Sequence, residues 1–313
     1  MQKKNITKKA LLVGSVVYDA LFDLTTPIND QIRIVDGKPG WQNLMFAAKS
    51  KQVYFGGPAG NIAYGLSLLK QKSILASVAG KDFVEYAAHL RHLSIDSRVV
   101  IIPQGHTATF YGMTDTNKQQ MGVFQPNSYH AELPKFPVSK LVKKNDWKNI
   151  SVGIFSPGTA ASIIRDMKEF KMCAPKNAIA IFDPGQMLAI DFTKKTFTEA
   201  VRHADMLIIN ETEAHFFKTK FNFSLEQLWK LGLKQCIVTL GSEGSVLHTP
   251  TDRVAIKAYK AKNVIDPTGA GDAYRAGLIH GILQGKSFPD AMDIGARLGA
   301  QCVACKGGQT YKV

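Results

Sequence analysis

The chain has 313 residues and 45% hydrophobic content, enough to bury a large core, and we expect residues 1–313 to form a single domain. Its net charge of +14 is spread from Lys3 to Lys312 without a basic stripe, so we expect no nucleic-acid partner. The chain has no run of about 18 apolar residues, its first residues lack the apolar stretch of a signal peptide, and its four cysteines make no disulfide framework, which predicts a cytoplasmic protein with no membrane partner.

Apolar segments with strand and helix periods alternate along the chain. Residues 10–17 (ALLVGSVV) form a continuous apolar run, typical of a buried parallel strand. Apolar residues at helical spacing occur at residues 60–69 and 82–93, with a strand-like run at 74–78 between them. This alternation predicts an α/β fold, a parallel sheet with helices on both faces. Further strands are predicted at residues 151–155, 178–182, 206–209 and 236–240.

Two segments interrupt the alternation. Residues 25–55 are polar and aromatic without a clear helical period, and residues 107–125 contain two short strand-like runs around Asn117 to Gln120. The second segment is typical of a β-hairpin. Together the two segments favour a small β-sheet lid, which would exclude water from a reacting group. An ordinary surface excursion is the alternative.

The first candidate ligand contacts follow early strands. Asp19 comes after the first strand, at the end where open α/β sheets bind ligands, and a carboxylate there can hold two vicinal hydroxyls. Residues 55–63 (FGGPAGNIA) form a glycine-rich turn before a helix, in which Gly57 permits close backbone approach. Asn61 offers both a donor and an acceptor to hydroxyl groups. Taken alone, Asp19 is more typical of a helix cap.

Two later strands also end in polar turns. Asn210 and Glu213 (NETE) carry oxygen atoms suited to Mg²⁺ with most of its waters retained, although an N-cap with an acidic first turn has the same pattern. Thr239, Gly241 and Gly244 (TLGSEG) form a strand-then-glycine turn that suits close contact with a nucleotide and is equally typical of a plain turn.

Residues 266–272 (DPTGAGD) are the most informative segment. The glycines let several N–H groups point at one spot as the chain enters a helix, and an anion belongs there. Asp272 lies in the first turn, where its carboxylate could accept the proton of a substrate hydroxyl during phosphoryl transfer. A lone segment of this kind also fits a capped structural turn.

Four of these segments, in this order and at these distances, resemble the ribokinase-like (PfkB) family of carbohydrate and nucleoside kinases. They are GGPAGNIA, NETE, TLGSEG and DPTGAGDAYRAG, and the resemblance extends from Val13-Gly14 to Gly307-Gly308-Gln309. It implies a three-layer α/β/α fold with a β-sheet lid, ATP as phosphoryl donor, Mg²⁺ as cofactor, and often a monovalent cation such as K⁺ near the nucleotide.

The resemblance also implies a role for each matching residue. Asp272 would be the base, beside an anion hole formed by the N–H groups of Gly269, Ala270 and Gly271. Asp266 would lie near the monovalent cation, with the chain near Gly308 as a second contributor. The acceptor would be held by Asp19, Gly57 and Asn61; ATP by Asn210, Thr239, Gly241, Gly244 and Gly271; and Mg²⁺, through water, by Asn210 and Glu213.

One stretch departs from the family pattern. Gly80-Lys81-Asp82 resembles the family's GxDxxG turn, but Glu85 and Tyr86 stand where a second glycine is expected. This departure puts the local backbone in doubt and leaves the predicted chemistry unaffected.

Four strings resemble nucleoside or adenosine kinases more than sugar kinases: Val123-Phe124-Gln125-Pro126, Phe182-Asp183-Pro184-Gly185-Gln186, Tyr274-Arg275 and Gly307-Gly308-Gln309. A nucleoside adds a flat base to the ribose, so the lid should supply an aromatic face, for which Phe110, Tyr111 and Phe124 are candidates. Packing within the lid is the alternative role of these rings.

The sequence therefore predicts an ATP-dependent kinase acting on the ribose 5′-hydroxyl of a purine nucleoside, adenosine first, as a monomer or homodimer. A broad nucleoside kinase and a free-sugar kinase for ribose or fructose are alternatives of the same class. A non-catalytic nucleotide-binding regulatory protein is the alternative from another class, and the intact Asp272 argues against it.

Overall fold

A nine-stranded sheet forms the centre of the computed structural model, which describes residues 8–31, 33–35, 38–40, 44–117, 119–261 and 263–313. The strand order is β15-β14-β13-β12-β11-β10-β1-β6-β7. Neighbours from β7 to β13 are parallel, whereas β14 and β15 are antiparallel. The strands are β1 (Lys9–Val13), β6 (Ser73–Gly80), β7 (Asp96–Ile102), β10 (Ile150–Phe155), β11 (Ile179–Phe182), β12 (Met206–Asn210), β13 (Gln235–Thr239), β14 (Ser245–His248) and β15 (Arg253–Ile256).

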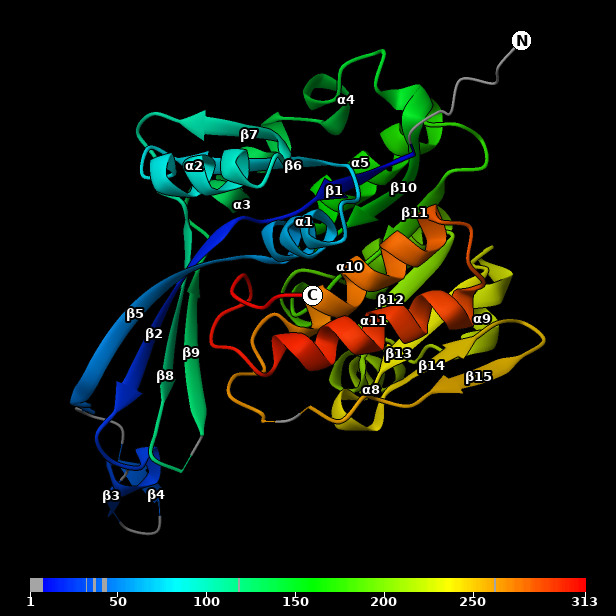
Figure 1. The fold of residues 1–313 in the computed structure, drawn as a ribbon. Coiled ribbons are helices and arrows are strands. Elements are labelled where there is room, and N and C mark those ends of the chain that lie inside the picture. Colours follow the sequence, from blue (N-terminus) through cyan, green and yellow to red (C-terminus); the bar gives the residue numbers. More distant parts are fainter. Residues whose placement is uncertain (1–7, 32, 36–37, 41–43, 118, 262) are drawn as a thin grey trace.

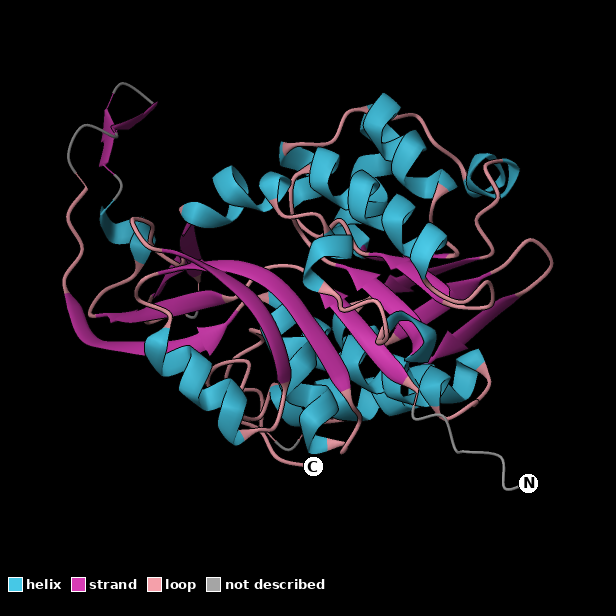
Figure 2. Cartoon of the chain, turned by 90° about the horizontal axis from the view of Figure 1, so that it is seen from above, coloured by secondary structure: helices cyan, strands magenta, loops and turns pink. Residues whose placement is uncertain are grey.

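Helices cover both faces of this sheet, as Figure 2 shows from above. Alternate strand residues such as Leu12 and Ile154 pack against α1 (Pro58–Leu68), α2 (Val84–His92), α10 (Ala270–Leu283) and α11 (Phe288–Cys302). Their neighbours Leu11 and Phe155 pack against α5 (Ala160–Cys173), α7 (Lys194–Arg202), α8 (Glu211–Lys220) and α9 (Leu225–Lys230). Because both faces are covered, central strands such as β1, β6 and β10 are largely apolar, and the predicted three-layer α/β/α fold is confirmed.

Short helical segments complete the described chain, and no helix in the described ranges is long and apolar enough to cross a membrane. These segments are η1 (Ile28–Gln31), α3 (Ser128–Glu132), η2 (Leu133–Lys135), α4 (Val138–Leu141), η3 (Trp147–Asn149), α6 (Met187–Ile190) and η4 (Gly241–Glu243).

A second sheet, the lid sheet, projects from the body as long strands on one side (Figure 1). Its order is β5-β2-β8-β9, and a small pair, β3 with β4, lies at its far end. The predicted hairpin is confirmed as β8 and β9. Part of the predicted lid segment, residues 32, 36–37 and 41–43, lies outside the described residues. The strands are β2 (Val17–Leu24), β3 (Arg33–Val35), β4 (Lys38–Gly40), β5 (Ala48–Gly56), β8 (Ala108–Thr114) and β9 (Gln120–Gln125).

The strand predicted over residues 10–17 is wrong at its carboxyl end. β1 ends at Val13, and the chain then leaves the main sheet and enters the lid as β2. At the crossing, Gly14 packs so tightly that a Cβ there would lie 2.7 Å from the Cβ of Ser156. The apolar run over residues 10–17 therefore belongs to two strands of different sheets. Asp19 lies in the second of them, the lid strand β2.

Candidate active site

Two carboxylates interact electrostatically where the lid joins the main sheet. Asp19 of β2 is 5% exposed, and Asp272 lies in the first turn of α10. Burial, and then the charges of Asp272 and Asp266, raise the pKa of Asp19 to about 7. Burial also raises the pKa of Asp272 to about 6, against the opposing effect of Arg275. The structure thus brings Asp19 and Asp272, predicted from distant motifs, into one electrostatically coupled pair.

Within the described ranges, the buried carboxylate of Asp19 accepts no hydrogen bond from the protein, although buried polar groups normally have partners. Gly56 lies directly against it, because a Cβ at that position would be 2.1 Å from Asp19 Oδ2. The site therefore leaves this carboxylate open to hydroxyl donors from a ligand.

Asn61 links the first glycine turn to the predicted base. Its Nδ2 donates to Asp272 Oδ2 at 2.8 Å, and the side chain is buried. Gly57, the N-cap of α1, has φ of 86° and lies close to the backbone oxygen of Ser15, so only glycine fits the turn. The structure brings the predicted residues Gly57, Asn61 and Asp272 together.

The turn before α10 has the geometry of an anion site. Gly269 is its N-cap with φ of 80°, and a Cβ there would lie 2.6 Å from the Cα of Gly308. The N–H of Ala270 is used in the turn, 3.2 Å from the oxygen of Pro267. No acceptor in the described ranges takes the N–H of Gly271, which is one of the unpaired donors at the N-terminus of α10.

Asp266 is hydrogen-bonded to two segments of this site. Its two carboxylate oxygens accept the backbone N–H groups of Thr268 and Gly307, each at 2.9 Å. The carboxylate thereby joins the turn before α10 to the C-terminal loop. The monovalent cation near Asp266 and Gly308 stays a prediction.

Asn210 and Glu213 form a reciprocal capping box at the start of α8. The Asn210 side chain accepts the N–H of Glu213, while its Nδ2 and backbone N–H donate to the two Glu213 oxygens at 2.9 and 3.0 Å. Asn210 is therefore an N-cap with acidic residues in the first turn, the alternative that the sequence also allowed. Water-mediated contact with Mg²⁺ fits the remaining lone pairs of Glu213 and stays a prediction; within the described ranges no three His, Cys, Asp or Glu side chains cluster as metal ligands.

The predicted ATP turn lies beside the capping box, because Thr239 is the register partner of Asn210 in the neighbouring strand. Gly241 and Gly244 have φ of 57° and 103°. A Cβ at Gly244 would lie 2.0 Å from the backbone oxygen of Ile256, so this turn requires glycine. Contact of this exposed turn with ATP stays a prediction.

The lid sheet places two predicted aromatic rings beside Asp19. Phe110 is the register partner of both Asp19 and Phe124, so the three side chains share one face of the lid. Tyr111, the next residue of β8, lies on the opposite face of the lid from Asp19, and its role as a base-stacking ring stays a prediction. The Phe110 ring lies over Gly112 and Gly122, where a Cβ would approach it to 2.9 and 2.5 Å.

Sequence reasoning missed a buried ion pair behind the base. Arg275 Nε and Nη2 donate to the two oxygens of Asp183 at 2.6 and 2.8 Å, and Arg275 Nη1 donates to the oxygen of Gly271 at 3.0 Å. Asp183 follows β11 at the carboxyl edge of the sheet. Both residues lay in strings that resembled nucleoside kinases, but 92 residues separate them and no motif predicted their contact.

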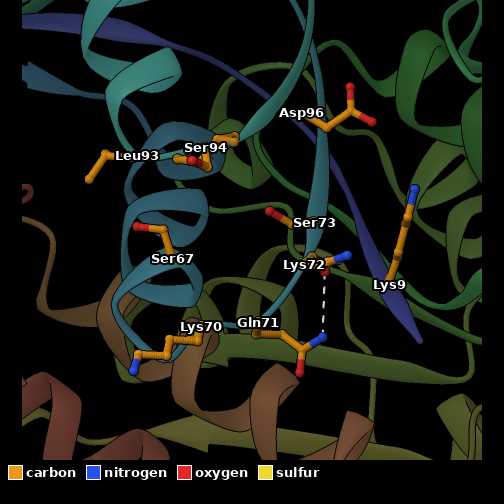
Figure 3. Close-up of a pocket in the computed structure, with 10 residues that line it drawn as sticks. Lys9, Ser67, Lys70, Gln71, Lys72, Ser73, Leu93, Ser94 and Asp96 are labelled. Atoms are coloured by element: carbon orange, nitrogen blue, oxygen red, sulfur yellow. Dashed lines mark hydrogen bonds between the residues drawn. The ribbon is translucent and has the colours of Figure 1, made fainter. Parts of the chain in front are cut away.

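A cavity of about 340 Å³ lies at the opposite edge of the sheet (Figure 3). Its lining includes Lys9, Ser73 and Asp96, the first residues of β1, β6 and β7. The predicted ligand residues Asn210 and Thr239 are instead the last residues of β12 and β13, at the carboxyl ends of the strands, where open α/β sheets bind ligands. This cavity is therefore separate from the carboxylate pair.

The fold and the site define the class of protein. A carboxylate beside a glycine turn and a helix N-terminus, at the carboxyl edge of a parallel sheet and next to a lid, is the arrangement of a phosphotransferase. The family model described as "pfkB family carbohydrate kinase" matches residues 20–312. The chain belongs to this family of kinases.

Relatives with known functions support this assignment. The chain is similar to a nucleoside kinase of Methanocaldococcus jannaschii, with 31% identity over 86% of this chain and 85% of the relative. The structure of that enzyme matches with a TM-score of 0.84, covering 97% and 94% of the two chains at 27% identity. Burkholderia thailandensis nucleoside kinase in complex with inosine matches with a TM-score of 0.82 and 28% identity, covering 96% and 93%. A ribokinase of Lactococcus lactis is 28% identical over 89% of this chain and 83% of the relative.

Proposed function

We propose that this kinase transfers the γ-phosphoryl group of ATP to the 5′-hydroxyl of a purine nucleoside, with adenosine as the first candidate. The observation that carries the proposal is the buried carboxylate of Asp19, which accepts no hydrogen bond from the described residues. It shares one face of the lid sheet with Phe110 and Phe124 and interacts electrostatically with Asp272. A ribose diol supplies the missing donors, and a base supplies an apolar face for the rings. The similarity to two nucleoside kinases supports the same substrate class.

In this proposal Asp272 removes the proton of the acceptor hydroxyl as its oxygen attacks the γ-phosphorus and the bond to the ADP oxygen breaks. The N–H of Gly271 and the N-terminus of α10 stabilise charge on the transferring group. Asn210 and Glu213 would hold Mg²⁺ through water, and the ion would neutralise part of the phosphate charge. Catalysis is then mostly positioning and electrostatics.

The pH dependence of kcat/KM tests the carboxylate pair. Both Asp19 and Asp272 must be ionised, one to accept the ribose hydroxyls and the other to accept a proton. Because their pKa values are raised to about 7 and about 6, activity should fall as the pH drops below 7 and fall more steeply below 6. An activity that stays constant down to pH 5 would contradict this assignment of the two groups.

Gly122→Ala tests the aromatic face of the lid. The new Cβ would lie about 2.5 Å from the Phe110 ring and force it off the sheet surface. If this ring stacks on the base, KM for the nucleoside should rise by roughly tenfold, the magnitude of one aromatic contact, with kcat little changed. Val123→Ala is the control, because Val123 is the next residue of β9 and its exposed side chain lies on the opposite face of the lid. An unchanged KM would leave Phe110 as lid core only.

An ADP-release assay over adenosine, inosine, guanosine, cytidine, ribose and fructose separates the candidate functions. Purine nucleosides should be turned over with the highest kcat/KM. A preference for ribose or fructose would favour the free-sugar kinase, in line with the similarity to the Lactococcus lactis ribokinase. No turnover with any acceptor would favour the non-catalytic nucleotide-binding protein.

A further inference from the structure

Tyr86, one of the two residues that stand where the family's turn has a glycine, contacts residues of the active site. Residues 81–83 form a turn that leads into α2, in which Glu85 is exposed and Tyr86 is fully buried. The Tyr86 hydroxyl donates to the backbone oxygen of Gly56 at 2.8 Å. It also lies where a Cβ on Gly60 would be, 2.0 Å away. The ring thus brings a fixed hydroxyl oxygen under the first glycine turn.

This hydroxyl fixes the amide orientation of Gln309 in the C-terminal loop. Because Tyr86 gives its only proton to Gly56, its oxygen can only accept from Gln309, and the amide must turn its Nε2 toward Tyr86. The Gln309 oxygen then faces Nε2 of His89 at 3.1 Å. His89 is held by stacking on Phe55, with ring centroids 4.7 Å apart. Gln309 is 7% exposed, so water offers it little alternative.

Gln309 in turn fixes Asn61. Its Nε2 also donates to Asn61 Oδ1 at 3.1 Å, so the Asn61 amide must present its Nδ2 to Asp272, where the hydrogen bond measures 2.8 Å. If Asn61 were flipped, its oxygen would face the carboxylate and two acceptors would repel. Tyr86 therefore determines which group donates and which accepts in each hydrogen bond from Gly56 to Asp272.

We infer that Tyr86 and Gln309 are positioning residues for the reaction, which hold Asn61 in the orientation that donates to Asp272. This inference rests on the proposed role of Asp272 as the base. The donor from Asn61 orients the carboxylate and favours its ionised form. Removing the chain of hydrogen bonds should therefore make the base harder to ionise, an effect that a merely structural contact would not have.

Other groups around Asp272 also act on its ionisation, and the test must not change the charge of any of them. Arg275 favours the ionised form, whereas Asp183 opposes it. Asp272 is also coupled electrostatically to Asp19 of the lid, Tyr86 of α2, Cys302 at the end of α11, and Tyr311 of the C-terminal segment. A substitution of Gln309 by an uncharged residue leaves each of these groups in place.

Gln309→Met is the direct test, measured as the pH profile of kcat at saturating nucleoside. Methionine has a similar length and no amide, so we expect kcat to fall roughly tenfold and the acid limb to move up by about one pH unit, the effect of one hydrogen bond to a charge. Gln71→Met is the matched control, because Gln71 is also buried and hydrogen-bonded but binds Lys8 and Gln284. The control should leave the profile unchanged.

Tyr86→Phe is the second variant, and it should move the acid limb in the same direction because both amides become free to flip. The midpoint of the limb does not depend on the fraction of folded protein. An unmoved limb in both variants, with an active wild type, would overturn the positioning role alone. If the wild type turns over no nucleoside, the proposed function fails instead, and carbon-13 NMR of the Asp272 carboxyl, assigned by its loss in Asp272→Asn, still decides whether Gln309→Met raises its pKa.

Discussion

Asp272→Asn is expected to reduce turnover by about 10² or more while folding and ATP binding stay nearly intact. The amide has the shape of the carboxylate but cannot take the proton of the acceptor hydroxyl, and a positioned base contributes factors of this size. Asn61 can still hydrogen-bond to the oxygen of the new amide, and Arg275 stays paired with Asp183. Single-turnover kinetics and calorimetric titration with ATP measure the two quantities separately.

Asp290→Asn is the matched control for this experiment. Asp290 also lies in the first turn of a helix, α11, but it is hydrogen-bonded to Ser287 away from the carboxylate pair. Its replacement should leave turnover unchanged. Wild-type turnover in Asp272→Asn would contradict the assignment of the base, whereas lost ATP binding would indicate a structural role for this carboxylate.

Arg275→Met should have the largest effect on stability. The guanidinium is 7% exposed and pairs with Asp183, which is 2% exposed, so the substitution leaves a buried carboxylate without its partner. Nearby Asp272 and Glu213 lose the same positive charge. Breaking a buried pair in this way typically costs about 3–5 kcal/mol of the free energy of unfolding. Chemical denaturation monitored by fluorescence measures the change.

Arg297→Met provides the comparison for the arginine. Arg297 pairs with Asp293 on the surface of α11, where solvent screens the interaction. Its loss should leave the denaturation midpoint unchanged. Equal midpoints for the Arg275 and Arg297 variants would show that Asp183 finds other donors when Arg275 is absent.

Much of the fold was predictable because strands that are buried on both faces must be apolar throughout. β6 (SILASVAG) is buried at every position. Segments with apolar residues at helical spacing follow such strands along the chain. The boundary at Gly14 was not predictable from the same signal. An apolar run that feeds two sheets has the same composition as one long strand, and only close packing against Ser156 separates them.

The candidate site was also predictable only in part. Glycine turns such as residues 266–272 are local in sequence, so their backbone geometry follows from residue type. The contacts of Tyr86 with Gln309 and of Asp183 with Arg275 span 223 and 92 residues. A single sequence contains no signal for such pairs, because each residue alone is an ordinary polar side chain.

The most direct test of the central claim is a competition experiment. The enzyme is incubated with ATP, Mg²⁺ and equal concentrations of adenosine, inosine, guanosine, cytidine, ribose and fructose, and mass spectrometry identifies the phosphorylated products. We expect purine nucleoside 5′-monophosphates to form first, adenosine 5′-monophosphate foremost, and to be missing with Asp272→Asn. Phosphorylated ribose or fructose in place of nucleotides, or the same products from Asp272→Asn at the same rate, would contradict it.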